Sequence, residues 1–152
     1  MNDRQLSELV MQALDSAIAK DADGAATAVQ TMGENSTDNQ MYGVCCAFAE
    51  AGVHVLKKLY GERAADITQG DMWVLGELKP GAFADDPHKA FSLRFLTSYA
   101  NNDRDNTLAL YQAALDSGGE SYVQSVCALL ATVSGLARLA LSETPELAEG
   151  DR

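Results

Sequence analysis

The stretch of sequence that decides the fold is residues 40–60, QMYGVCCAFAEAGVHVLKKLY. Its apolar residues recur at three-and-four spacing without a proline, so it predicts a long helix that ends before Gly61. Thr37 and Gln40 stand in front of it at the spacing of a capping box. Because the apolar side chains cover more than half of the helix circumference, one neighbouring helix could not bury them all. We therefore expect a central helix that is covered on at least two sides.

The same spacing predicts further helices on both sides of this one. Asp3 is expected to cap the first helix, Gly33 to end the second, and the pair Asp86-Pro87 to start the fourth. No strand pattern appears. The fold class predicted is all-α, as an antiparallel helical bundle or a short helical-repeat array of six to seven helices. The other predicted helices span about 4–20, 23–33 and 120–142, and two more lie between Asp86 and Ser117, separated by the turn 101–106.

With 152 residues, the chain has the length of one domain with a full hydrophobic core. We expect a single helical domain over 1–142, followed by an acidic flexible tail over 143–152. Within the domain, a connector over 62–85 with one short helix joins the halves 1–61 and 86–142.

A shift of 81 residues superposes the three N-terminal helices on the three C-terminal ones and keeps their apolar positions in phase. Cys46 then falls on Cys127, and Ala28 falls on Ala109. The residues that match are few, so the similarity is one of pattern. We therefore expect a two-fold internal repeat of three helices each as a possible arrangement. The other aligned sets are Val10, Leu14 and Ile18 with Phe91, Phe95 and Tyr99, and Cys45, Ala49, Gly52 and Leu56 with Val126, Leu130, Val133 and Ala137.

One short strip resembles a known repeat family. Thr107, Tyr111, Ala114 and Leu115 are spaced like the second helix of a tetratricopeptide unit, and the turn 101–105 resembles the turn between its helices. The resemblance covers under a fifth of the chain, and the sequence does not repeat with the period of that family. It implies stacked antiparallel helices and a peptide-binding role.

The charge of the chain limits its partners. Eleven Lys and Arg against 22 Asp and Glu give a net charge of -11 at pH 7, which repels polyanions, so we expect no direct nucleic-acid binding. The acidic residues are spread along the chain, as on a solvated surface, and a carboxylate-rich face that mimics nucleic acid is the less favoured alternative.

Cysteine usage and the apolar segments bear on localisation. Cys45, Cys46 and Cys127 suit neither a disulfide framework nor a paired metal motif, and they are typical of buried thiols in a reducing compartment. The uncharged stretch 121–137 is too short for a bilayer span, and no signal sequence is recognised at the N-terminus. We expect a cytoplasmic protein without membrane contact.

The motifs of well-marked catalytic families are missing, so we expect no enzyme and no cofactor. The candidate binding surface combines large apolar side chains of the connector with an aromatic strip at i, i+4 and i+8 behind His88. An alternative is that the connector residues fill the gap between the halves, and that His88 packs or accepts a hydrogen bond. The candidate residues are Met72, Trp73, Phe83, His88, Phe91, Phe95 and Tyr99.

Cys46, Glu50 and His54 follow one another at four-residue spacing and form a slanted line on the central helix. Thiolate, carboxylate and imidazole groups all bind metals, so these residues are a weak candidate metal site. The alternative is an exposed Glu-His pair beside a buried thiol, because a metal would need a further ligand from a distant element.

The leading functional hypothesis is a non-enzymatic protein-protein interaction or adaptor module that binds a protein or peptide, or itself as a homodimer, through a groove between its halves. The alternative from another class is a small-ligand-binding or enzymatic helical domain with a pocket around His88 and Trp73.

Overall fold

The computed structural model describes the backbone of residues 1–74 and 85–150, and the side chains of that range as far as residue 142. This part of the chain forms six α-helices and two 3-10 turns, with no β-strand, so the all-α prediction is confirmed. The helices are α1 (Asp3–Ile18), α2 (Ala22–Asn35), α3 (Asp38–Tyr60), α4 (Pro87–Ala100), α5 (Arg104–Asp116) and α6 (Gly119–Gly150).

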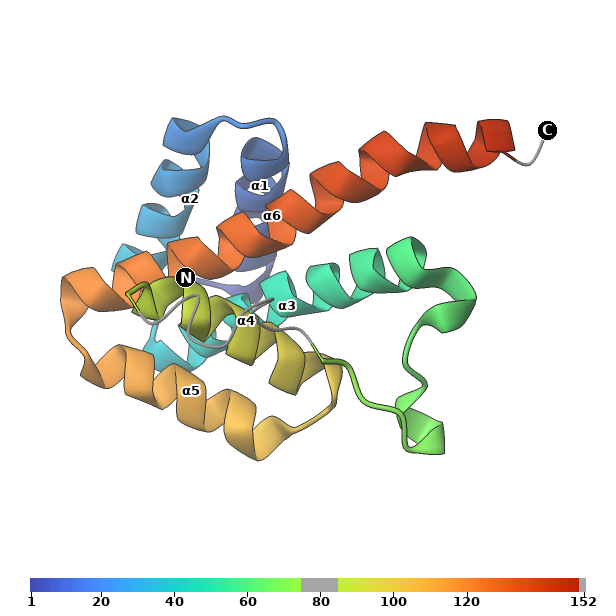
Figure 1. The fold of residues 1–152 in the computed structure, drawn as a ribbon. Helices are drawn as coiled ribbons and strands as arrows, with labels where there is room; N and C mark the ends of the chain where they lie inside the picture. The colour runs from blue at the N-terminus through green and yellow to red at the C-terminus, as the bar shows by residue number, and fades with distance from the viewer. Residues whose placement is uncertain (75–84, 151–152) are drawn as a thin grey trace.

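Two helical hairpins flank a central pair of helices. The hairpins α1–α2 and α4–α5 lie on opposite sides of α3 and α6, and α6 runs on past the body of the molecule (Figure 1). The helix α3 packs against α1, α4 and α6. Its wide apolar surface is therefore covered on several sides, as the broad arc of its sequence predicts.

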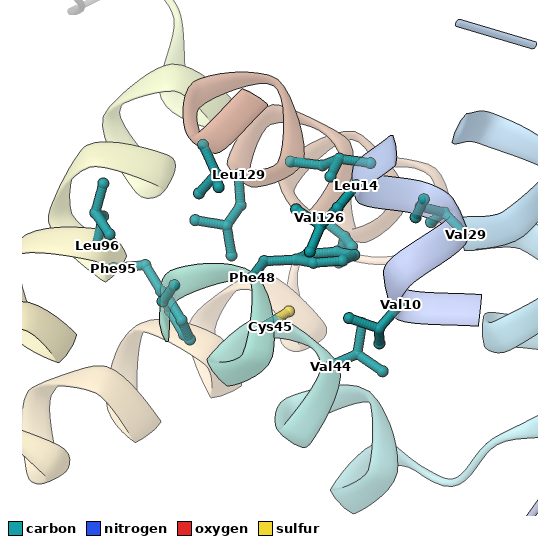
Figure 2. Close-up of a cluster of buried hydrophobic side chains, with 14 of the residues drawn as sticks. Val10, Leu14, Val29, Val44, Cys45, Phe48, Phe95, Leu96, Val126 and Leu129 are labelled. Carbon is teal, nitrogen blue, oxygen red and sulfur yellow. The ribbon is translucent and has the colours of Figure 1, made fainter. Parts of the chain in front are cut away.

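The core forms where the two hairpins meet the central helices. Figure 2 shows Phe48 of α3 between residues of α1 and α6, with Phe95 of α4 on the other side of α3. Both phenylalanines are fully buried. A single hydrophobic cluster holds residues from all six helices, including Leu14, Val29, Leu96, Tyr111 and Val126.

Helix ends agree with local capping chemistry, with two corrections. Thr37 and Gln40 form the predicted capping box of α3, and the side chain of Asp86 caps α4 ahead of Pro87. The cap of α1 is Asn2 and not Asp3, because the Asn2 side chain accepts the N–H of Gln5, three residues on. Gly33 does not end α2, which continues to Asn35.

The connector holds less helix than predicted among its described residues. It contains two 3-10 turns, Gly61–Arg63 and Ile67–Gln69, and the backbone of 71–74 has no regular structure. Residues 75–84, with Phe83 among them, lie outside the described part. At the other end α6 extends to Gly150, past the predicted end at 142, and the predicted flexibility of 143–152 stays a prediction.

Buried positions recur in the two halves, but at two different offsets. In the first two helices the offset is 82 residues, as for Ala13 with Phe95, and in the third helix it is 81, as for Phe48 with Leu129. The single offset of 81 was therefore wrong for Ala28 and Ala109, since Ala28 is buried and Ala109 is exposed. Duplication itself stays a prediction. Further buried pairs are Val10 with Ser92, Leu14 with Leu96, Val29 with Tyr111, Cys45 with Val126 and Leu56 with Ala137.

The corners that join the helices of each hairpin share one hydrogen-bond pattern. Lys20 and Asn102 both have a positive φ, at 62° and 59°. The next residue in each corner caps the following helix: Asp21 accepts the N–H of Gly24, and Asp103 accepts that of Asn106. Both aspartates therefore act as helix caps.

One described helix is long and apolar enough to span a membrane. Within α6, the stretch Gly119–Ser142 has this length and composition, and half of its most apolar window is buried inside the protein. The uncharged stretch 121–137 is shorter than this segment, because the residues on both sides of it also belong to α6. A core helix has the same properties, so the predictions on membrane contact and localisation stay predictions.

Candidate functional site

The predicted aromatic strip lines none of the four grooves described below. Phe91 and Phe95 belong to the core, at 8% and 0% exposure. Tyr99 is half-buried, and its hydroxyl donates a hydrogen bond to Oε2 of Glu50 over 2.8 Å. The guanidinium of Arg104 lies 4.3 Å from the centre of the Tyr99 ring, a cation–π distance.

His88 contacts a serine on α6. Its Nδ1 lies 3.0 Å from Oγ of Ser125, a distance that also occurs between nucleophile and base in hydrolases. Ser125 is only 4% exposed, and neither residue lines any of the four grooves described below. The contact thus satisfies a buried hydroxyl group within the α4–α6 interface.

Trp73 and Met72 differ in their exposure. Trp73 is 7% exposed and packs edge-on against Tyr60, with ring centres 5.6 Å apart. The backbone N–H of Trp73 donates to Oδ1 of Asn101, and the side-chain amide of Asn101 donates back to the Trp73 carbonyl. Trp73 therefore holds the connector against the ends of α3 and α4. Met72 is 71% exposed and lines the largest groove described here.

The side chains at Cys46, Glu50 and His54 do not converge. His54 Nε2 lies 3.9 Å from Oε1 of Glu50, and both side chains are more than half exposed. Burial raises the pKa of the Cys46 thiol, which forms a hydrogen bond with Tyr42. Among the described residues no three potential metal ligands come together, so this line of residues is not assembled as a metal site.

Four open grooves are lined by described residues. The largest, about 780 Å³, lies beside the α4–α5 corner and the connector. Two others have volumes of about 460 and 440 Å³. The first is lined by α1 and α3, and the second by the end of α3, the connector and Ala100 of α4. The fourth, about 390 Å³, is lined by α1 and α2 of one half and by α6 of the other, and we call it the inter-half groove.

The inter-half groove lies between the α1–α2 corner and α6. Its lining is mostly apolar and small, because four of the five residues from the first half are alanines. Arg138 of α6 closes one edge, where its Nη1 donates to the carbonyl oxygen of Ala17 over 2.8 Å. The same carbonyl, at the C-terminal end of α1, also accepts the backbone N–H of Lys20. The lining residues are Ala17, Lys20, Ala22, Ala25, Ala26, Cys127, Leu130, Ala131, Ser134 and Arg138.

The charges that line this groove are both positive. They belong to Lys20 and Arg138, and no acidic residue is in the lining, although the chain has a net charge of -11. Asp21, next to Lys20 in the chain, is engaged in capping α2. The groove therefore offers two cationic groups beside an apolar floor.

The groove offers little to acid-base or nucleophilic catalysis. Burial raises the pKa of the Cys127 thiol, which keeps it in the less nucleophilic protonated form. The Ser134 hydroxyl donates to the carbonyl of Ala131, and no histidine or carboxylate is in the lining. The lining groups are therefore better suited to binding than to bond breaking.

Reasoning from the sequence missed this groove. The alanines of α1 and α2 stand at helical spacing, which predicts a packed helix surface. The helix that faces them, α6, follows about a hundred residues later in the sequence. No protein family model matches the sequence, and no curated protein or solved structure is detectably similar to it.

Proposed function

We propose that this protein is a non-enzymatic helical interaction module that binds a peptide segment of a partner protein in the inter-half groove. The observation that carries the proposal is this apolar groove, lined by α1, α2 and α6, with lysine and arginine at its edge. Small-molecule sites normally bury most of their ligand. An open groove is better suited to a side chain that is anchored on a larger partner.

The test is a selection from a random peptide library on the wild-type protein, followed by affinity measurements on two variants. Ala131→Trp fills the groove from an exposed position of α6. Ala113→Trp is the matched control, at an exposed alanine of α5 that does not line the groove. Selected peptides should bind the control like wild type and Ala131→Trp at least tenfold more weakly, about 1.4 kcal/mol. Equal binding to Ala131→Trp, or no enrichment, contradicts the proposal.

Self-association is a second candidate, favoured by exposed apolar side chains in two regions. Met72 and Val74 of the connector are 71% and 89% exposed, and Leu139 and Leu141 of α6 are 47% and 63% exposed. Exposed apolar side chains are candidate contacts for a second copy of the chain. Sedimentation at several concentrations tests it: a shift to dimer in wild type that Leu139→Lys abolishes supports a homodimer, and a monomer at every concentration excludes one.

The small-ligand alternative around His88 and Trp73 has less support. His88 contacts Ser125 of α6, whereas Trp73 is held by Asn101 at the far end of α4. No groove described here is lined by both residues.

A further inference from the structure

The positions that line the inter-half groove have counterparts in the other half of the molecule. With the offsets that align the buried positions, Ala17 corresponds to Tyr99, Ala22 to Arg104, and Ala131 to Glu50. The three alanines line one groove, whereas among their counterparts Tyr99 contacts both Glu50 and Arg104. The two corners are thus built alike but filled differently.

At the second corner, between α4 and α5, the corresponding place beside α3 is filled by the protein's own side chains. The Tyr99 ring packs under the guanidinium of Arg104, and its hydroxyl donates to the Glu50 carboxylate. An aromatic ring, a carboxylate and a cation therefore meet beside α3. The first corner has the small side chain of alanine at all three positions, which leaves a groove of about 390 Å³.

Charge shows which of these groups the first corner lacks. Lys20 and Arg138 already supply cations at its edge, while no ring and no carboxylate is in its lining. Arg138 uses Nη1 on the Ala17 carbonyl, and the guanidinium has further N–H donors for an acceptor. Lys20 stands at the exposed tip of the corner with a positive φ. The unfilled place therefore suits a ring that carries or adjoins a carboxylate.

We infer that the inter-half groove binds an aromatic side chain flanked by carboxylates, presented by an acidic segment of the partner protein. The inference rests on the proposed function and names the chemistry of the segment. The net charge of -11 does not prevent this binding, because charges beyond about 10 Å are screened at 0.1 M salt. The carboxylates of a short segment then interact mainly with the two cations beside them.

The test uses three synthetic peptides and two readouts. The probe is the acetylated peptide Gly-Glu-Tyr-Glu-Gly, and its controls replace either the tyrosine by alanine or both glutamates by glutamine. Affinity is measured by NMR titration of the full chain. The second readout is the rate at which the Cys127 thiol, which lines the groove, reacts with a maleimide. Cys46, similarly half-buried but outside the groove lining, is the internal control.

The probe should slow modification of Cys127 at least threefold and leave Cys46 unchanged. Each control peptide should bind at least fivefold more weakly than the probe, because one loses the ring and the other the charges. Among protein variants, Ala131→Glu places in the groove the carboxylate that Glu50 supplies at the other corner, and it should lower the affinity for the probe peptide at least tenfold. Ala131→Gln, of nearly equal size, should weaken it less than threefold. Lys20→Gln should weaken it at least threefold.

Two outcomes separate the inference from the proposed function. If the glutamine peptide protects Cys127 as well as the probe does, the groove binds peptides but the assignment of an acidic segment is overturned. If no short peptide protects Cys127 and the library selection also fails, both the inference and the proposed function are overturned.

Discussion

Gly52 and Leu96 are in such close contact that a β-carbon on Gly52 would lie 2.9 Å from Cδ1 of Leu96. The same β-carbon would lie 3.2 Å from Cγ2 of Val133. Both neighbours are fully buried, so neither can move without disturbing the core. At this glycine α3 approaches both α4 and α6 closely, and the closeness explains why the residue has to be small.

Replacement of this glycine should therefore destabilise the protein. Gly52→Ala gains helix propensity of about 1 kcal/mol but causes overpacking that costs about 1–3 kcal/mol, so we expect a net loss of about 1 kcal/mol in the free energy of unfolding. Gly43→Ala in the same helix is the control, because nothing lies within 4 Å of its added methyl group, and it should stabilise. Urea unfolding checks both. A stabilising Gly52→Ala would contradict the close approach.

Asn101 holds the connector through two hydrogen bonds with Trp73. Asn101→Ala should release the indole ring to water, shift its fluorescence to longer wavelength, and lower stability by about 1–2 kcal/mol. Trp73 is the single tryptophan, so the emission is unambiguous. Asn102→Gly is the control: its φ of 59° suits glycine, and the emission should stay at the wild-type wavelength. Unchanged emission in Asn101→Ala would disprove the anchoring role.

Stability should decrease in alkaline solution. Burial, with the nearby Cys46 thiol, raises the pKa of Tyr42 to about 12, and burial raises that of Tyr111 further. Above pH 10 the unfolded chain loses these protons while the folded protein keeps them, so the free energy of unfolding falls as pH rises. Urea unfolding at pH 8, about 10 and about 11 checks the slope. Tyr42→Phe should flatten the slope between pH 10 and 12, and an unchanged slope would contradict the burial of this phenol.

The three thiols should react at different rates with an aromatic disulfide reagent at pH 8. Cys45 is fully buried, and burial raises its pKa far above the ordinary value, so it should react only on unfolding. Cys46 and Cys127 are half-buried and should react slowly in the folded protein. Two thiols per chain are expected without denaturant and three in denaturant. Three fast-reacting thiols would show that the core around Cys45 opens readily.

Helix positions were predicted well where the signal is local. The capping box at Thr37 and the Asp86-Pro87 start depend on hydrogen bonds and backbone angles within four residues, and both are present. Gly33 was misjudged because glycine permits a helix to end without requiring it. The connector was less predictable, since its position depends on Asn101, 28 residues beyond Trp73 in the chain.

The candidate site was predicted poorly because exposure is a property of the packed molecule. Phe91 and Phe95 form a strip that suits a pocket or a core equally well, and the packing of α3 and α6 against α4 buries them. The inter-half groove depends on the opposite signal, small residues. Ala17 and Ala131 lie more than a hundred residues apart, and only the placement of α6 beside the α1–α2 corner brings them together.

The sequence by itself determined the helices, most of their caps, the acidic surface charge and the phase of the buried faces, because these follow from contacts between residues close in the chain. Tertiary structure alone decided which apolar residues are covered and which corner is filled. A helix face has no partner until distant helices pack on it, and the volume left between them depends on side chains from both. Tyr99 fills the place between its corner and α3, and Ala17 leaves the corresponding place beside α6 open.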